Sequence, residues 1–273
     1  MKKAFIIGHP ISHSRSPLIH GTWLRAHGID GRYEAIDVAP DALPVFIARM
    51  RAGEFVGGNV TVPHKEAVFA LCDSVDPLAR SIGAVNTLFA KNGTVHGFNT
   101  DYLGFLGNLD QKAPGWDKGL HTAIVLGAGG ASRAILVALR ERGVKTIHLL
   151  NRTIDKAEAL AAEFGPAIRP GPLESFNTIA PEAGLVVNAS SIGMHGTRFE
   201  GIDLARLQKT ALVTDIVYVP LITPLLADAA ALGLKTVDGL GMLLHQAVPG
   251  FEAWFGVRPE VTPALRQAVE ATL

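Results

Sequence analysis

Hydrophobic residues in the second half of the chain alternate between short continuous runs and helical patterns. Residues 122–126 (TAIVL) form an uninterrupted apolar run with β-branched side chains, which is typical of a strand buried on both faces. The elements predicted after it are a helix over 134–143, a strand over 144–150, a helix over 153–165 capped by Thr153, and strands over 185–190 and 211–218. Strands that alternate with helices imply a parallel sheet covered on both faces, so we expect a doubly wound, Rossmann-like domain here.

The first hundred residues show the same alternation. We expect strands over 2–8 and 31–38, a helix over 16–28 capped by Ser16, and a helix over 62–72 that begins at Pro63. A further amphipathic helix starts at Asp101, and its apolar stripe consists of Tyr102, Phe105, Leu106 and Leu109. The pattern therefore predicts two α/β domains.

Length, composition and charge narrow the class of protein. With 273 residues, 48% of them hydrophobic and 18% charged, the chain has enough material for two cores, which excludes disorder for most of its length. Lys plus Arg and Asp plus Glu both number 25, and no basic block is present, so we expect neither nucleic acid nor an acidic membrane surface as a partner. No apolar stretch reaches the ~18–20 residues that a membrane span needs.

Cysteine and histidine usage bears on compartment and metal binding. Cys72 is the only cysteine, so no internal disulfide can form, and the first residues lack the apolar run of a signal peptide. We therefore expect a reducing cytoplasm, with Cys72 as a small core residue. The ten histidines include no HExxH pattern, and Pro10 between His9 and His13 opposes the helix that would bring them together, so we expect no metal.

The segment between the strand 122–126 and the next helix reads GAGGASR. Gly127 permits the turn, Gly129 lets the backbone approach a pyrophosphate, and the helix N-terminus supplies free N–H groups. Ser132 stands where a third Gly or Ala is usual, a change that affects helix–strand packing more than phosphate contact. The segment is typical of a dinucleotide-binding loop in its expected context.

The second strand of this domain ends in Asn151-Arg152-Thr153. An NAD site normally places Asp or Glu there to bind the ribose 2′-hydroxyl, whereas a guanidinium pairs with a 2′-phosphate and stacks on adenine. NADP is therefore favoured over NAD. The alternative is that Arg152 is a solvated loop residue.

Polar clusters in the first half are not explained by a simple core. Ser14 and Ser16 lie at a predicted helix N-terminus, where hydroxyls and backbone amides suit a carboxylate. Lys65 falls in the first turn of the predicted helix 62–72, where the positive end of the helix dipole disfavours a cation, and this favours a functional role. The alternatives are helix caps for Ser16 and Asp101 and a solvated helix residue for Lys65.

Nine segments, in order along the chain, resemble the shikimate dehydrogenase family: GHPISHSRSP, NVTVPHK, GAVNT, NTD, GAGGASR, NRT, NASSIGM, DIVYVPLITPLL and GLGMLLHQA. The resemblance implies two α/β domains with the active site in the cleft between them. Residues 1–101 plus 239–273 would form the substrate-binding catalytic domain, and residues 102–238 the Rossmann-like NADP-binding domain. It also implies the family's reaction, the reversible NADPH-dependent reduction of 3-dehydroshikimate to shikimate in chorismate and aromatic amino acid biosynthesis.

The resemblance also assigns roles to individual residues. Lys65 and Asp101 match the family's catalytic dyad, which relays a proton to or from the substrate. The residues expected to bind substrate or position the dyad are Ser14, Ser16, Asn59, Thr61, Lys65, Asn86, Asp101, Tyr218 and Gln246, with the two serines and Tyr218 on the carboxylate. The residues expected to bind the cofactor are Gly127, Ala128, Gly129, Gly130, Ala131, Asn151, Arg152, Thr153, Ile216, Gly239 and Met242. Core packing for Met242 and strand termination for Gly239 stay open as alternatives.

Other interpretations also stay open. A paralogue that acts on quinate or aminoshikimate would carry the same residues, and a non-catalytic NADP-sensing module would have little reason to carry both Lys65 and Asp101. A homodimer is compatible with the sequence. Pro249-Gly250, just after Gln246, is predicted to kink or interrupt the last long helix.

Overall fold

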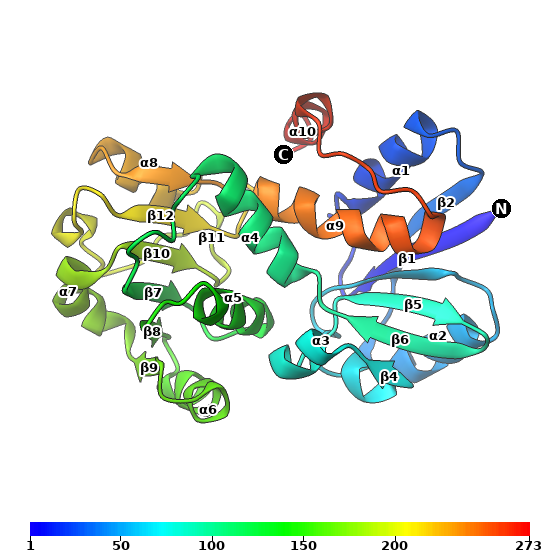
Figure 1. The fold of residues 1–273 in the computed structure, drawn as a ribbon, viewed down its shortest axis with the longest axis horizontal. Coiled ribbons are helices and arrows are strands. Elements are labelled where there is room, and N and C mark those ends of the chain that lie inside the picture. Colours follow the sequence, from blue (N-terminus) through cyan, green and yellow to red (C-terminus); the bar gives the residue numbers. More distant parts are fainter. The chain divides into compact units, whose positions relative to one another are not determined.

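The computed structural model describes residues 1–273 and divides them into two α/β units, each with its own six-stranded sheet (Figure 1). The first unit comprises Met1–Gly104 and Leu244–Thr272, and the second comprises Phe105–Leu243 with Leu273. The predicted fold class of two α/β domains, one of them doubly wound, is confirmed.

The first unit contains a mixed sheet with the strand order β2-β1-β3-β5-β6-β4. Its strands are β1 (Lys2–Gly8), β2 (Gly31–Asp37), β3 (Gly57–Val60), β4 (Ser74–Val75), β5 (Thr87–Lys91) and β6 (Thr94–Phe98). Its helices are α1 (Ser16–Ala26), α2 (Leu43–Arg51), α3 (Pro77–Ile82), α10 (Pro263–Glu270) and most of α9 (Leu240–Phe255). Strands β1 and β3 are parallel, so the segments after them leave the same edge of the sheet.

The core of the first unit is aromatic. Phe5 on β1 meets the rings of Phe46 and Phe55 edge-to-face, with centroids 4.8 and 5.1 Å away. All three side chains are buried, and each contributes roughly 1.5–3 kcal/mol by its removal from water. This packing fixes β1 and therefore the edge from which the polar segments of the site emerge.

The second unit contains a fully parallel sheet with the strand order β13-β12-β10-β7-β8-β9. Its strands are β7 (Thr122–Leu126), β8 (Thr146–Leu150), β9 (Ile168–Gly171), β10 (Leu185–Asn188), β12 (Leu212–Asp215) and β13 (Lys235–Val237), with β11 (Ile192–His195) outside the sheet. Its helices are α5 (Gly130–Glu141), α6 (Ile154–Phe164), α7 (Phe176–Ile179), α8 (Pro224–Ala231) and most of α4 (Asp101–Lys112). Four consecutive residues of β7 are buried because helices cover both faces, as the continuous apolar run predicts.

The helix predicted over 62–72 is wrong. Only a short 3₁₀ helix forms there, over Val68–Leu71, and Lys65 lies in the turns before it. Tertiary contacts hold this backbone open: the carbonyl of Lys65 accepts the Val85 N–H at 2.9 Å, and the buried His64 ring bonds the Val38 carbonyl at 2.7 Å. Because Lys65 is not in an α-helix, the helix dipole does not act on its charge.

Of the two outcomes predicted for Pro249-Gly250, a kink or an interruption, the interruption is wrong, because α9 runs from Leu240 to Phe255 without a break. The turn after the proline is held by burial, since Phe251 is fully buried and Trp254 is 2% exposed. The Trp254 indole donates to the Leu88 carbonyl at 2.8 Å, and a Cβ at Gly250 would lie 2.7 Å from the Trp254 ring. Packing thus offsets the backbone hydrogen bond that Pro249 cannot make.

Smaller features complete the comparison with the predicted elements. Helix α1 begins at Ser16 and takes Arg15, rather than Ser16, as its N-cap. None of the helices combines the length and hydropathy that crossing a membrane requires. No group of three or more His, Cys, Asp or Glu side chains is arranged to hold a metal ion.

Candidate active site

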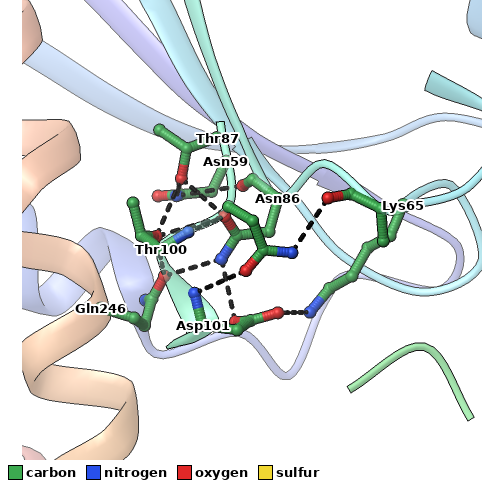
Figure 2. Close-up of polar contacts among 9 residues, drawn as sticks. Asn59, Lys65, Asn86, Thr87, Thr100, Asp101 and Gln246 are labelled. Atoms are coloured by element: carbon green, nitrogen blue, oxygen red, sulfur yellow. Dashed lines mark hydrogen bonds and ion pairs between the residues drawn. The ribbon is translucent and has the colours of Figure 1, made fainter. Parts of the chain in front are cut away.

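Lys65 and Asp101 form an ion pair in the first unit (Figure 2). The Lys65 Nζ lies 2.5 Å from Asp101 Oδ2, and the two side chains are only 15% and 9% exposed. Lys65 comes from the turn after β3, and Asp101 is the first residue of α4. The tertiary structure thus brings together two residues that lie 36 positions apart in the sequence.

Asn86 holds the second oxygen of the Asp101 carboxylate. The backbone N–H of Thr100 donates to Asn86 Oδ1 at 2.7 Å, so the amide nitrogen faces the other way. That nitrogen donates to Asp101 Oδ1 at 2.9 Å. Both oxygens of Asp101 therefore accept hydrogen bonds, which fixes the plane of the carboxylate against Lys65.

Asn59 and Gln246 approach the same cluster from β3 and α9. Gln246 Oε1 lies 3.5 Å from Asn86 Nδ2 and 3.4 Å from Thr100 Oγ1. Asn59 donates to the Asn86 carbonyl at 3.3 Å and to Thr87 Oγ1 at 3.1 Å, and its own oxygen accepts the Tyr33 hydroxyl. Figure 2 shows these side chains gathered close to Asp101, together with Thr87 and Thr100.

Ser14, Ser16 and Thr61 follow strands β1 and β3 at one edge of the sheet. Ser14 Oγ accepts the backbone N–H of Ser16 at 3.3 Å, and Ser16 is 2% exposed. Thr61 is half-buried, with its backbone N–H on the Ile7 carbonyl. Tyr218, by contrast, lies in the second unit, half-buried in the segment after β12.

The glycine loop of the second unit has a conformation that requires glycine at its first position. Gly127 has a φ of +105°, and a Cβ there would lie 2.8 Å from the Cβ of Ser190. At Gly129 a Cβ would meet nothing within 4 Å, so the space beside that backbone is open. Gly130 is the first residue of α5 and Ala131 the second, both half-buried. An open backbone at a helix N-terminus suits a pyrophosphate.

Ser132 shapes this loop from within. Its hydroxyl donates to the Gly127 carbonyl at 2.7 Å and accepts the Gly129 N–H at 3.1 Å. The side chain is fully buried. The residue that departs from the usual glycine pattern is therefore the one that ties the two glycines together.

Asn151 joins the glycine loop to the end of β8. Its oxygen accepts the Ala128 N–H at 3.2 Å, and its nitrogen donates to the Thr153 carbonyl at 2.8 Å. Arg152 and Thr153 are exposed between these contacts. Strands β7 and β8 pair in parallel up to Leu126 and Leu150, so the loops that follow them leave the same edge. These residues fit a dinucleotide whose ribose carries a phosphate.

The remaining predicted cofactor residues lie near β12 and the start of α9. A Cβ at Gly239 would lie 2.5 Å from the Ile216 carbonyl oxygen, so these two backbones touch. Met242 is 8% exposed. Just before Ile216, burial raises the pKa of Asp215, while hydrogen bonds from Asn188, Thr223 and the Val217 N–H act in the opposite direction.

Several residues of the first cluster were not predicted from the sequence. Tyr33, Thr87, Asn99 and Thr100 are buried and bond to Asn59, Asn86 or Asp101. The available signal was the repeated Asn-Thr pair, at 86–87 and again at 99–100. Tyr33 carried no local signal, because its partner Asn59 lies on a different strand.

Comparison with known families decides the affiliation. Residues 6–88 match the model of the shikimate dehydrogenase substrate binding domain, residues 112–242 that of shikimate/quinate 5-dehydrogenase, and residues 239–270 that of the shikimate 5′-dehydrogenase C-terminal domain. The chain belongs to the shikimate dehydrogenase family. The resemblance seen in the sequence is thereby confirmed.

Relatives within the shikimate dehydrogenase family match along the whole chain. The NADP(+) shikimate dehydrogenase of Mesorhizobium japonicum is 56% identical over 272 residues, covering 100% of this chain and 97% of the relative. The Thermus thermophilus shikimate 5-dehydrogenase, solved with NADP(H) and shikimate, is 40% identical with a TM-score of 0.87 and complete coverage of both chains. The Corynebacterium glutamicum quinate dehydrogenase, solved with NAD, is 31% identical with a TM-score of 0.90, covering 100% of this chain and 99% of that one.

Proposed function

We propose that this enzyme catalyses the reversible NADPH-dependent reduction of 3-dehydroshikimate to shikimate, a step of chorismate and aromatic amino acid biosynthesis. The observation that carries the proposal is the Lys65–Asp101 ion pair, set among buried amides and hydroxyls in the first unit. The 56% identity to a NADP(+) shikimate dehydrogenase over the full chain supports the choice of substrate and cofactor.

The Lys65–Asp101 dyad transfers the proton to or from the substrate. Lys65 presents an N–H to the ring oxygen of the substrate, donating the proton in the reductive direction and receiving it in the oxidative one. Asp101 orients the ammonium and balances its charge. NADPH, when bound, supplies the hydride.

The other polar residues bind and orient the substrate. Ser14 and Ser16 hold the carboxylate, assisted by Tyr218, while Thr61 and Gln246 bond the ring hydroxyls and Asn86 positions Asp101. Asn59 acts behind them, because both ends of its amide are already engaged within the protein. A site of this kind rejects an analogue that lacks a hydroxyl, since a buried polar group would lose its partner.

The second unit binds NADP in this proposal. The pyrophosphate binds to the backbone of Gly127 to Ala131 at the start of α5. The ribose 2′-phosphate binds beside Asn151, Arg152 and Thr153. Ile216, Gly239 and Met242 line the cofactor further along. The substrate domain, expected over 1–101 plus 239–273, then corresponds to the first unit. The NADP domain, expected over 102–238, corresponds to the second unit, which extends to Leu243 and so includes Gly239 and Met242.

The test is the initial rate of cofactor reduction with shikimate or quinate, each combined with NADP or NAD. We expect the highest kcat/KM for shikimate with NADP. The structural similarity to a quinate dehydrogenase makes quinate the second candidate substrate, and better turnover of quinate with NAD would move the enzyme to that role. Tight NADP binding without oxidation of either acid would instead point to an NADP-sensing module.

Location and assembly belong to the proposal as well. We place the enzyme in the cytoplasm, in keeping with a chain whose single cysteine excludes an internal disulfide. A homodimer stays a prediction, and the molar mass from light scattering across a concentration series would decide it.

A further inference from the structure

Two buried hydroxyls lie behind the dyad without touching it. Tyr33 on β2 is 7% exposed, and Thr87 at the start of β5 is 3% exposed. Neither contacts Lys65 or Asp101. Thr87 bonds to Asn86, which holds Asp101, and Tyr33 bonds to Asn59, which in turn bonds to Thr87. These hydrogen bonds connect Tyr33 through Asn59, Thr87 and Asn86 to Asp101, and we call this series the Asn86 chain.

The orientations of the Asn86 and Asn59 amides follow from their hydrogen-bond partners, whereas in the 3.0 Å contact between Thr87 Oγ1 and Thr100 Oγ1 either hydroxyl can be the donor. The Thr100 backbone N–H is a donor only, so Asn86 must present its oxygen to it and its nitrogen to Asp101. Thr87 Oγ1 has one proton and two lone pairs. Asn59 Nδ2 donates to it at 3.1 Å, and its own proton reaches Asn86 Oδ1 at 2.9 Å.

Tyr33 is the residue of the Asn86 chain that lies farthest from Asp101 along its hydrogen bonds. Its hydroxyl donates to Asn59 Oδ1 at 2.6 Å, which turns the Asn59 nitrogen toward Thr87. Burial raises the pKa of Tyr33 well above its ordinary value, against the opposing effect of a hydrogen bond with Ser16, so the hydroxyl keeps its proton and stays a donor. The His20 ring stacks on Tyr33 with centroids 4.0 Å apart, which restricts movement of the phenol.

A reversed Asn86 amide shows why the orientation matters. With nitrogen and oxygen exchanged, the amide oxygen would face the Asp101 carboxylate, and the nitrogen would face the Thr100 N–H. Both contacts would be repulsive in a buried setting, where they cost most. The hydroxyls of Thr87 and Thr100, at 2.9 and 3.2 Å from Asn86 Oδ1, are further donors to the correct orientation, and Thr87 is the nearer of the two.

We propose that Thr87 and Tyr33 are positioning residues for the reaction, holding the Asn86 amide with its NH₂ toward Asp101 so that the carboxylate stays aligned with Lys65. The inference rests on the proposed function of the dyad. It assigns to the hydroxyls a contribution to turnover rather than to cofactor binding, because the cofactor residues lie in the other unit.

The experiment compares Thr87→Val, Thr87→Ser and Tyr33→Phe with the wild type in the full-length enzyme. We expect Thr87→Val to lower kcat about tenfold, because the hydrogen bonds it loses orient a charged group. Thr87→Ser keeps the hydroxyl and should stay within about twofold of the wild type, and Tyr33→Phe should lower kcat about three- to tenfold. The KM for NADP should not change in any of them.

Thr214→Val is the matched control. Thr214 is also a buried strand threonine, 2% exposed, and its hydroxyl donates to the Val237 carbonyl at 2.9 Å in the second unit. This variant loses a buried hydroxyl without touching the Asn86 chain, so its kcat should match the wild type. The Thr87→Val/Tyr33→Phe double variant should lose less than the product of the two single losses, because both act on one chain.

Specific outcomes would overturn the inference. A folded Thr87→Val enzyme with wild-type kcat, or a Thr87→Ser enzyme as slow as Thr87→Val, rules out a role for the hydroxyl. If Thr87→Val does not fold, Tyr33→Phe decides, and wild-type kcat in that variant overturns the proposal. Lys65→Met distinguishes a failure of the proposed function from a failure of this inference. Full activity of Lys65→Met would contradict the role of the dyad. An inactive Lys65→Met enzyme together with fully active Thr87→Val and Tyr33→Phe enzymes would contradict only the role of the two hydroxyls.

Discussion

Lys65 acquires its chemistry from residues that lie far from it in the sequence. Asp101 neutralises its charge, and Asn86 holds Asp101. The pair is largely shielded from water, so the loss of one partner leaves an uncompensated charge in a poorly solvated position. A lone lysine in NVTVPHK is ordinarily a solvated residue, and only its partners make it a candidate catalytic residue.

His20 shows how burial makes stability depend on pH. The side chain is fully buried, and burial lowers its pKa to about 3 from 6.5, against a smaller opposing effect of a hydrogen bond with Asn59. The unfolded chain therefore binds a proton between pH 6.5 and about 3 that the folded chain refuses. Stability from this site is complete above the unfolded pKa of about 6.5 and is lost as the pH falls, by about 1.4 kcal/mol per pH unit.

His20→Phe tests this prediction, because phenylalanine keeps the ring that stacks on Tyr33 and removes the titration. We expect the free energy of unfolding of the variant to fall less steeply than that of the wild type between about pH 6 and 4, as measured by urea denaturation at each pH. Parallel curves over that range would show that His20 does not titrate as described.

At the scale of elements, the loop between β7 and α5 contains one glycine that the backbone conformation requires and another that only ligand binding requires. Gly127 has a left-handed φ and a crowded Cβ position, so its substitution strains the protein itself. Gly129 has a φ of −101° and open space around it, so an alanine fits without contact with the protein. The sequence pattern treats both positions alike, and only the structure distinguishes them.

This difference predicts opposite behaviour for two alanine variants. Gly127→Ala should lower stability by about 1–3 kcal/mol. Gly129→Ala should melt like the wild type while raising the KM for NADP about tenfold, because the methyl group occupies the space of the pyrophosphate. Thermal melting and steady-state kinetics measure the two effects. An unchanged KM for NADP in Gly129→Ala would show that the cofactor does not pack against this backbone.

Two elements show the limit of local pattern. The segment 62–72 has helical periodicity, but long-range bonds to Val38 and Val85 hold it in turns. Helix α9 contains Pro249 and Gly250, but the burial of Phe251 and Trp254 keeps it continuous. In each case tertiary contacts outweigh a local conformational preference. The largest such preference, that against a proline inside a helix, is about 3 kcal/mol.

For the whole molecule, ligand binding should appear as a gain in stability. A cofactor that binds only the folded chain stabilises it by about 2.7 kcal/mol at roughly a hundred times its Kd. We expect NADP to raise the Tm clearly and NAD at the same concentration to raise it much less, because Arg152 is exposed beside the glycine loop and no acidic residue takes its place. Scanning calorimetry with each cofactor measures this, and equal shifts would contradict the assignment of NADP.

The sequence by itself determined the alternation of strands and helices, the glycine loop, the Asn151-Arg152-Thr153 corner and the family. These features are local in the chain: the hydrophobic period, turn glycines and short motifs need no distant partner to be recognised. Only the tertiary structure decided that Lys65 sits in a turn, that α9 passes through Pro249, and that Tyr33, Thr87 and Asn86 form one directed chain to Asp101. Those features depend on contacts between residues far apart in sequence, whose packing and hydrogen bonds exceed the preferences that any short segment expresses alone.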